Sequence, residues 1–128
     1  MDEDQEVVER RFTVEEANAL IDGLRPRLEV LRAARRVILR SGRRIRRNAA
    51  LDGGGSEGSE LWQALGTVRR EAERLAEEGI ILRDAESGLI DFPSERDGRP
   101  VLLCWRLGED RVAWWHPPDT GFTGRRPL

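Results

Sequence analysis

Apolar residues in the first half of the chain recur at alternating intervals of three and four residues, the spacing of one helix face. One series covers residues 17–45 and a second covers residues 61–75. Both series predict long helices with coiled-coil-like apolar seams. Pro26 lies inside the first series, and an interior proline costs a helix about 3 kcal/mol. We therefore expect a kink there, or a short first helix that ends near Leu24.

Short motifs indicate where these helices begin and end. Thr13 followed by Glu16 fits a capping box, in which each side chain binds a free backbone amide of the first turn. Gly79 is placed to end the second helix in a left-handed conformation. Two seams joined by a polar loop predict an antiparallel helical hairpin. The expected segments are a first helical segment (13–51), a Gly/Ser loop (52–59) and a second helix (60–79).

After residue 79 the apolar period falls to two, which is typical of strands. Four short strands are expected within residues 80–116, followed by a C-terminal tail at 117–128. We expect a small four-stranded antiparallel β-meander with one face packed on the hairpin, because such a sheet needs a layer to cover it. The expected fold class is α+β, with residues 1–128 forming a single domain and the acidic residues 1–11 a mobile arm.

The charges of the chain are arranged in bands. Residues 1–24 carry eight acidic residues and two arginines, whereas residues 25–51 carry ten arginines and one acidic residue, Glu29. The second helix is again acidic, so we expect it to pair with the arginines of the first. A helix with so many arginines could bind nucleic acid through phosphates. The pI near 5.6 and the lack of any known nucleic-acid motif make this an alternative that we do not favour.

The location and redox state follow from what the sequence contains. The chain has one cysteine, so no internal disulfide can form, and a reducing cytoplasm is the expected compartment. The acidic N-terminus has no apolar signal-peptide region, and no run of apolar residues is long enough to span a bilayer. We therefore expect a cytoplasmic protein without a membrane partner.

Five motifs stand in a fixed order along the chain: RFTVEEANAL, GLIDFP, LCWRLGE, WWH and GFTGRRPL. In this order and spacing they resemble an uncharacterised bacterial family, known as domain of unknown function 2203. The resemblance covers roughly residues 11–128 and implies no established activity, cofactor or partner.

The only cysteine and the only histidine, Cys104 and His116, lie on the third and fourth expected strands. If the three residues 109–111 form the loop between these strands, Cys104 lies directly opposite His116. A two-residue loop shifts the register by one and places the two side chains on opposite faces. Their proximity therefore depends on a turn that the sequence does not determine.

Three interpretations of this pair stay open. The two side chains could bind a divalent metal such as zinc, with Asp91, Glu15 or Glu16 completing the ligand set. They could form a thiolate–imidazolium nucleophile oriented by a group such as Asp91 or Asp119. They could also be structural, with a buried thiol and a histidine bonded to backbone. The structural interpretation is the one that the sequence favours.

Glycine, arginine and tryptophan near the C-terminus suggest a second kind of site. Arg106 stacked on Trp114 could bind a planar or anionic ligand. Gly124 and Arg125 could together bind a carboxylate or phosphate. The structural alternative is that the tail docks on the sheet through Phe122.

The sequence therefore favours a protein-interaction or regulatory module that forms a homodimer or binds a partner protein, because long apolar seams often pair with other helices. The alternative is an enzyme that binds a metal or small ligand around Cys104, His116 and Asp91. Whether the chain is an enzyme is left undecided by the sequence.

Overall fold

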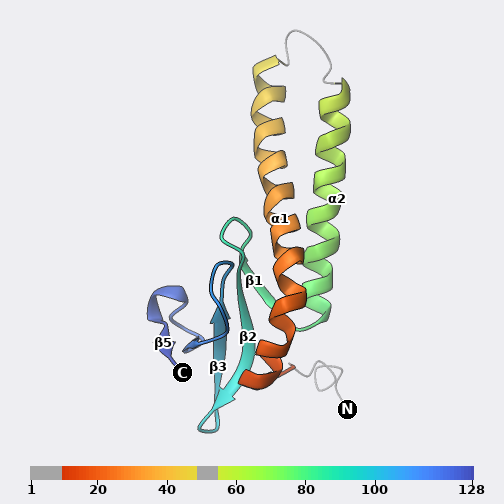
Figure 1. The fold of residues 1–128 in the computed structure, drawn as a ribbon. Helices are drawn as coiled ribbons and strands as arrows, with labels where there is room; N and C mark the ends of the chain where they lie inside the picture. The colour runs from red at the N-terminus through yellow and green to blue at the C-terminus, as the bar shows by residue number, and fades with distance from the viewer. Residues whose placement is uncertain (1–9, 49–54) are drawn as a thin grey trace, which may run out of the picture.

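The structure is a computed structural model that describes residues 10–48 and 55–128. It confirms the α+β class: two helices stand beside a five-stranded antiparallel sheet (Figure 1). Neither described helix has the length and apolar composition that a membrane crossing requires. In chain order, the elements are α1 (Val14–Asn48), α2 (Gly55–Glu77), β1 (Ile81–Asp84), β2 (Leu89–Arg96), β3 (Arg99–Trp105), β4 (Trp114–His116), a single 3-10 turn (Phe122–Gly124) and β5 (Arg126–Pro127).

The two helices form the expected hairpin, and their far halves project beyond the sheet (Figure 1). The capping box at the start of α1 is formed, with Thr13 Oγ1 accepting the Glu16 amide at 3.0 Å and Glu16 Oε1 accepting the Thr13 amide at 2.8 Å. The expectation of a helix end near Leu24 is wrong, because α1 continues through Pro26. Leu24 and Leu28 on either side of the proline are buried, and this packing offsets the lost hydrogen bond.

The loop between the helices is shorter than expected, and two other predicted segments lie wholly or partly outside the described residues. α2 begins at Gly55, so the predicted loop at 52–59 is wrong for residues 55–59. Glycine and serine have low helix propensity, but packing against a neighbouring helix outweighs propensity. Most of the predicted acidic arm, residues 1–9, and the segment 49–54 lie outside the described residues.

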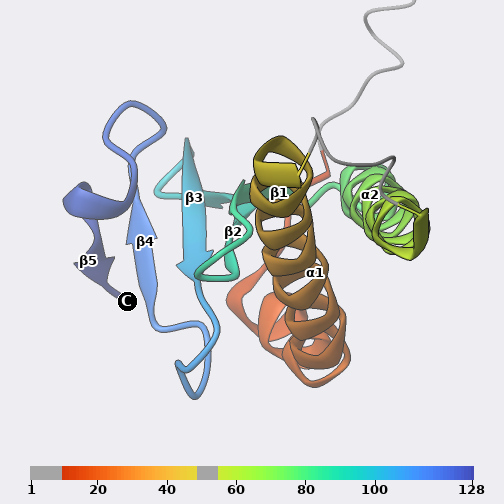
Figure 2. The same cartoon turned by 90° about the horizontal axis from the view of Figure 1, so that it is seen from above.

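The sheet is a meander in the order β1-β2-β3-β4-β5, with each strand antiparallel to its neighbours (Figure 2). The sequence predicted four strands, and the fifth comes from the expected tail. β5 is only two residues long and includes Pro127, which has no amide to donate and is suited to an edge strand. The amide of Leu128 extends this pairing by donating to the carbonyl of Ala113 at 2.9 Å.

The β2–β3 hairpin has the two-residue turn that Asp97 and Gly98 predict. Both residues have positive φ, at 54° and 77°, as this tight turn requires. The turn places Arg96 opposite Arg99 and so determines every pairing between the two strands. Asp91 consequently lies directly opposite Cys104.

The hydrophobic core lies between α1 and one face of the sheet. The sheet contributes Ile90, Phe92, Leu103 and Trp105, each at most 2% exposed. The ring of Phe12, just before α1, meets Phe92 edge to face with centroids 5.2 Å apart. Because side chains alternate along a strand, the residues between these core positions face away from α1.

Ion pairs join α1 to the rest of the fold. Arg27 pairs with two acidic residues of α2, Glu71 and Glu78, as the charge bands predicted. Arg35 and Arg36 instead pair with Glu86, in the turn between β1 and β2. The arginine band therefore contacts the sheet as well as the acidic helix.

Candidate metal centre

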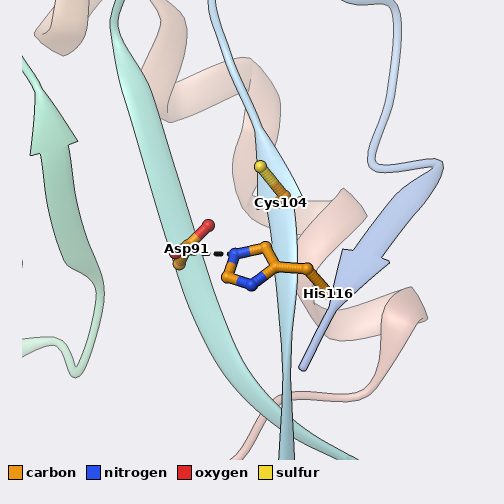
Figure 3. Close-up of side chains that lie close together, drawn as sticks. All are labelled: Asp91, Cys104 and His116. Carbon is orange, nitrogen blue, oxygen red and sulfur yellow. Dashed lines mark hydrogen bonds and ion pairs between the residues drawn. The ribbon is translucent and has the colours of Figure 1, made fainter. Parts of the chain in front are cut away.

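Asp91, Cys104 and His116 come together on the sheet face that points away from α1 (Figure 3). Asp91 on β2 pairs with Cys104 on β3, and His116 on β4 pairs with Leu102. Leu102 and Cys104 are two residues apart on one strand, so their side chains share a face. All three candidate ligands therefore point to the same side of the sheet.

The register that produces this arrangement is not the one considered from the sequence. Residues 106–113 connect β3 to β4, a longer connection than either loop considered. Cys104 lies opposite Trp114, and His116 is its diagonal neighbour. The proposed opposition of Cys104 and His116 is therefore wrong, although the two side chains do share a face.

The cluster is compact and closed. The carboxylate, thiol and imidazole each offer one atom, and these atoms all lie within 4.8 Å of one another. Each of the three residues is only 1% exposed. Buried polar groups are costly unless they are paired, so the partners of each atom decide what the cluster can do.

The hydrogen bonds of His116 show which ring nitrogen carries a proton. Nδ1 lies 2.7 Å from the carbonyl oxygen of Pro117, which can only accept, so Nδ1 is a donor. Nε2 lies 3.1 Å from Oδ2 of Asp91. With a metal ion present, the ring would be neutral and its Nε2 lone pair free to bind the metal.

The two oxygens of Asp91 have different surroundings. Oδ2 accepts a hydrogen bond from Nε of Arg83 at 2.7 Å in addition to its contact with His116. Oδ1 is buried without a hydrogen-bond partner in the described part of the chain. A buried carboxylate oxygen without a partner is unfavourable unless a hydrogen-bond donor or a cation binds it.

Burial raises the pKa of the Cys104 thiol from 9.0 to about 12, and the nearby negative charge of Asp91 adds to this effect. Arg125 acts in the opposite direction but more weakly. At neutral pH the metal-free thiol is therefore protonated, which argues against a free thiolate nucleophile. A bound cation reverses this situation, because a coordinated thiol loses its proton.

The other two candidate ligands do not join the cluster. Glu15 and Glu16 lie in the first turn of α1, which packs on the opposite face of the sheet. The Glu16 carboxylate is engaged in the capping box. The ligand set that the structure brings together is therefore Asp91, Cys104 and His116.

A family comparison covers almost the whole described chain. Residues 10–128 match the family described as "Uncharacterized conserved protein (DUF2203)". The chain belongs to this family. The DUF2203 family has no established function. No curated protein matches the sequence, and no solved structure matches this member of the family.

The residues predicted to bind an anion are arranged differently in this DUF2203 protein. Arg106 lies over the ring of Phe122, at 5.0 Å, in place of the expected Trp114. Arg125 stacks on Trp114 at 5.0 Å and forms an ion pair with Glu109 at 2.7 Å. Gly124 ends the 3-10 turn, with its amide donating to the carbonyl of Gly121. The tail of this DUF2203 protein is thus held to the sheet by the pairing of β5 with β4 and by the Arg125–Glu109 ion pair. Phe122, through which docking was expected, is 37% exposed.

Sequence reasoning missed one residue of the cluster, Arg83. Its guanidinium pairs with Asp91 across β1 and β2. The pairing of these strands is irregular between Leu82 and Asp84, so simple alternation could not assign a face to Arg83. No sequence signal in this DUF2203 chain marks that irregularity.

Proposed function

We propose that the cluster of Asp91, Cys104 and His116 binds a divalent ion of the zinc class. The observation that carries the proposal is that a thiol, an imidazole and a carboxylate lie close together in a buried cluster, in which Oδ1 of Asp91 has no hydrogen-bond partner. These three groups are the usual protein ligands of zinc, and three of them leave one position of a tetrahedral shell for water. A bound ion would stabilise the thiolate form of Cys104 in this buried setting.

The surrounding contacts support the same proposal. A metal-bound histidine usually donates its other N–H to a carbonyl or carboxylate, as Nδ1 of His116 does to Pro117. A metal-bound carboxylate is usually held by a further hydrogen bond, and Arg83 supplies one to Asp91. Both ligands are thus oriented by groups that would not themselves touch the ion.

The depth of the cluster points to a structural or regulatory ion. Its residues are each 1% exposed, so a substrate could not reach the ion without movement of the chain. The ligands come from β2, β3 and β4, so the ion would tie three neighbouring strands together. This role fits a regulatory module better than an enzyme. A cytoplasmic location belongs to the proposal, because a thiol ligand must remain reduced.

Thermal unfolding with and without zinc tests the proposal. At a free ion concentration of 100 times Kd, binding stabilises the fold by about 2.7 kcal/mol, or roughly 10 °C in Tm. We expect His116→Ala to abolish this rise and Glu15→Ala, the matched control outside the cluster, to retain it. If His116→Ala fails to fold, Cys104→Ser should show the same loss.

Two results would contradict a metal site. One is an unchanged Tm when zinc is added to wild-type protein that was first treated with EDTA. The other is an equal rise in wild-type and His116→Ala. Elemental analysis of protein purified without an affinity tag gives an independent measurement, and we expect one equivalent of metal per chain.

A second proposal, favoured by the exposed side chains of α2, is self-association through the hairpin. Trp62 is 75% exposed and Leu65 41% exposed, and their spacing of three places them on one helix face. An antiparallel second copy would cover this face.

Light scattering at micromolar concentration tests this second proposal. We expect about twice the chain mass of 14.6 kDa, and a monomer for Trp62→Glu. Glu60→Gln, another exposed change on α2, serves as the control and should remain dimeric. A wild-type monomer across the concentration range would refute self-association and leave the metal proposal unaffected.

A further inference from the structure

A cleft separate from the metal cluster lies between the β2–β3 turn and the C-terminal tail. Its volume is about 660 Å³, within the usual range for small-molecule sites. Three arginines from different parts of the chain surround a tryptophan there. The residues that the argument uses are Arg96, Arg99, Arg126, Trp115 and Asp97.

Two of these arginines are positioned by the tryptophan ring. The guanidinium carbons of Arg96 and Arg126 lie over Trp115, at 5.0 and 5.2 Å from the ring centroid. Neither guanidinium donates a hydrogen bond to another group in the described part of the chain, so their N–H donors are available to a ligand. The ring therefore restrains both side chains without using their hydrogen-bonding capacity.

These charges are also not neutralised in the described part of the chain. No described carboxylate lies within ion-pair distance of the guanidinium groups of Arg96, Arg99 or Arg126. Asp97 is the one acidic residue among those that line the cleft, so the lining has an excess of positive charge. The neighbouring Arg125 differs from Arg126 in this respect, because its charge is neutralised by an ion pair with Glu109.

We propose that this cleft binds a small ligand that carries a diphosphate or longer polyphosphate group. Planar N–H forks match phosphate oxygens, and several restrained arginines suit a ligand with several adjacent negative charges. The limited volume favours a small molecule over a nucleic acid. The proposal is independent of the metal centre, because none of the three metal ligands lines the cleft.

Calorimetric titration of the full chain with inorganic pyrophosphate, in EDTA, tests the proposal. We expect binding that weakens with salt and is at least tenfold weaker in Arg96→Gln/Arg126→Gln. Arg40→Gln/Arg43→Gln removes the same charge from α1, outside the cleft, and should bind within twofold of wild-type. Asp97→Asn should bind about threefold more tightly, because it removes the opposing charge while asparagine tolerates the positive φ.

The remaining outcomes distinguish the sources of the phosphate and can overturn the proposal. ADP binding more tightly than pyrophosphate would support a nucleotide, and equal affinities would support a ligand read through its diphosphate alone. If wild-type protein does not bind pyrophosphate at millimolar concentration, the proposal that this cleft binds a diphosphate is refuted. Equal losses in the two double variants would also refute it, as would a clear preference for a short DNA duplex over pyrophosphate.

Discussion

Cys104 should react with iodoacetamide far more slowly in the folded, metal-free protein than in the unfolded chain. The reacting species is the thiolate, so the rate follows the fraction of ionised thiol. The folded pKa of about 12 compares with an ordinary value of 9.0. At pH 8 this corresponds to about one thiolate in ten thousand in the folded protein, against about one in ten when unfolded. Ionisation alone therefore slows the reaction about a thousandfold, and burial slows it further.

The assay is direct because Cys104 is the only cysteine of the chain. Protein in EDTA is alkylated at several pH values, with and without urea, and the mass increase is followed over time. We expect the folded rate to rise about tenfold per pH unit from pH 8 to 10 without a plateau, as long as labelling occurs in the folded state. Rapid labelling with a midpoint near pH 7 would refute the reasoning and favour an activated nucleophile.

The same pKa shift makes stability depend on pH. Because the folded pKa of Cys104 is raised, the fold favours the neutral thiol. Its contribution is fully present below pH 9.0 and is lost as the pH rises towards 12, on the order of 4 kcal/mol in total. We expect the Tm of the metal-free protein to fall between pH 9 and 11, and to fall less in Cys104→Ala, which has no thiol to ionise.

Two further predictions concern the fold and are measured by urea unfolding. Gly88→Ala places a Cβ 2.5 Å from Leu107 at a φ of 66° and should cost about 3 kcal/mol, whereas Gly98→Ala, at a φ of 77° in open space, should cost about 1 kcal/mol. Equal losses of unfolding free energy in the two variants would contradict the close approach of Gly88 to Leu107. Arg27→Gln breaks partly buried pairs between the helices and should cost about 1–2 kcal/mol, while Arg36→Gln, which is exposed, should leave the midpoint unchanged.

Local motifs explain the parts of the fold that the sequence predicts well. The Thr13–Glu16 box and the two apolar seams are short-range patterns, so they determine the start of α1 and the helical hairpin. The Asp97–Gly98 turn is equally local and determines the β2–β3 register. Residues 106–113 and the two-residue β5 carry no such pattern, and their positions depend on packing with distant parts of the chain.

The candidate site shows the same division. Once the strand pairing is known, the alternation of side chains along a strand is enough to place Asp91, Cys104 and His116 on one face of the sheet. The pairing of β3 with β4, however, could not be predicted from the sequence. Arg83 could not be placed because its strand pairing is irregular. The stacking of Arg126 on Trp115 depends on how the tail folds back, which no local signal predicts.

The projection of the hairpin beyond the sheet has a consequence for cooperativity. At 1.5 Å per residue, the 35 residues of α1 extend for about 52 Å. Leu24, Leu28 and Leu31 are buried in the core, whereas Arg43 and Arg47 in the last turns are exposed. Amide protons near the end of α1 should therefore exchange with solvent by local fraying, while those around Leu28 exchange only when the whole fold opens. The protein would then unfold from its tip in graded steps, with the sheet and the base of α1 as its last cooperative unit.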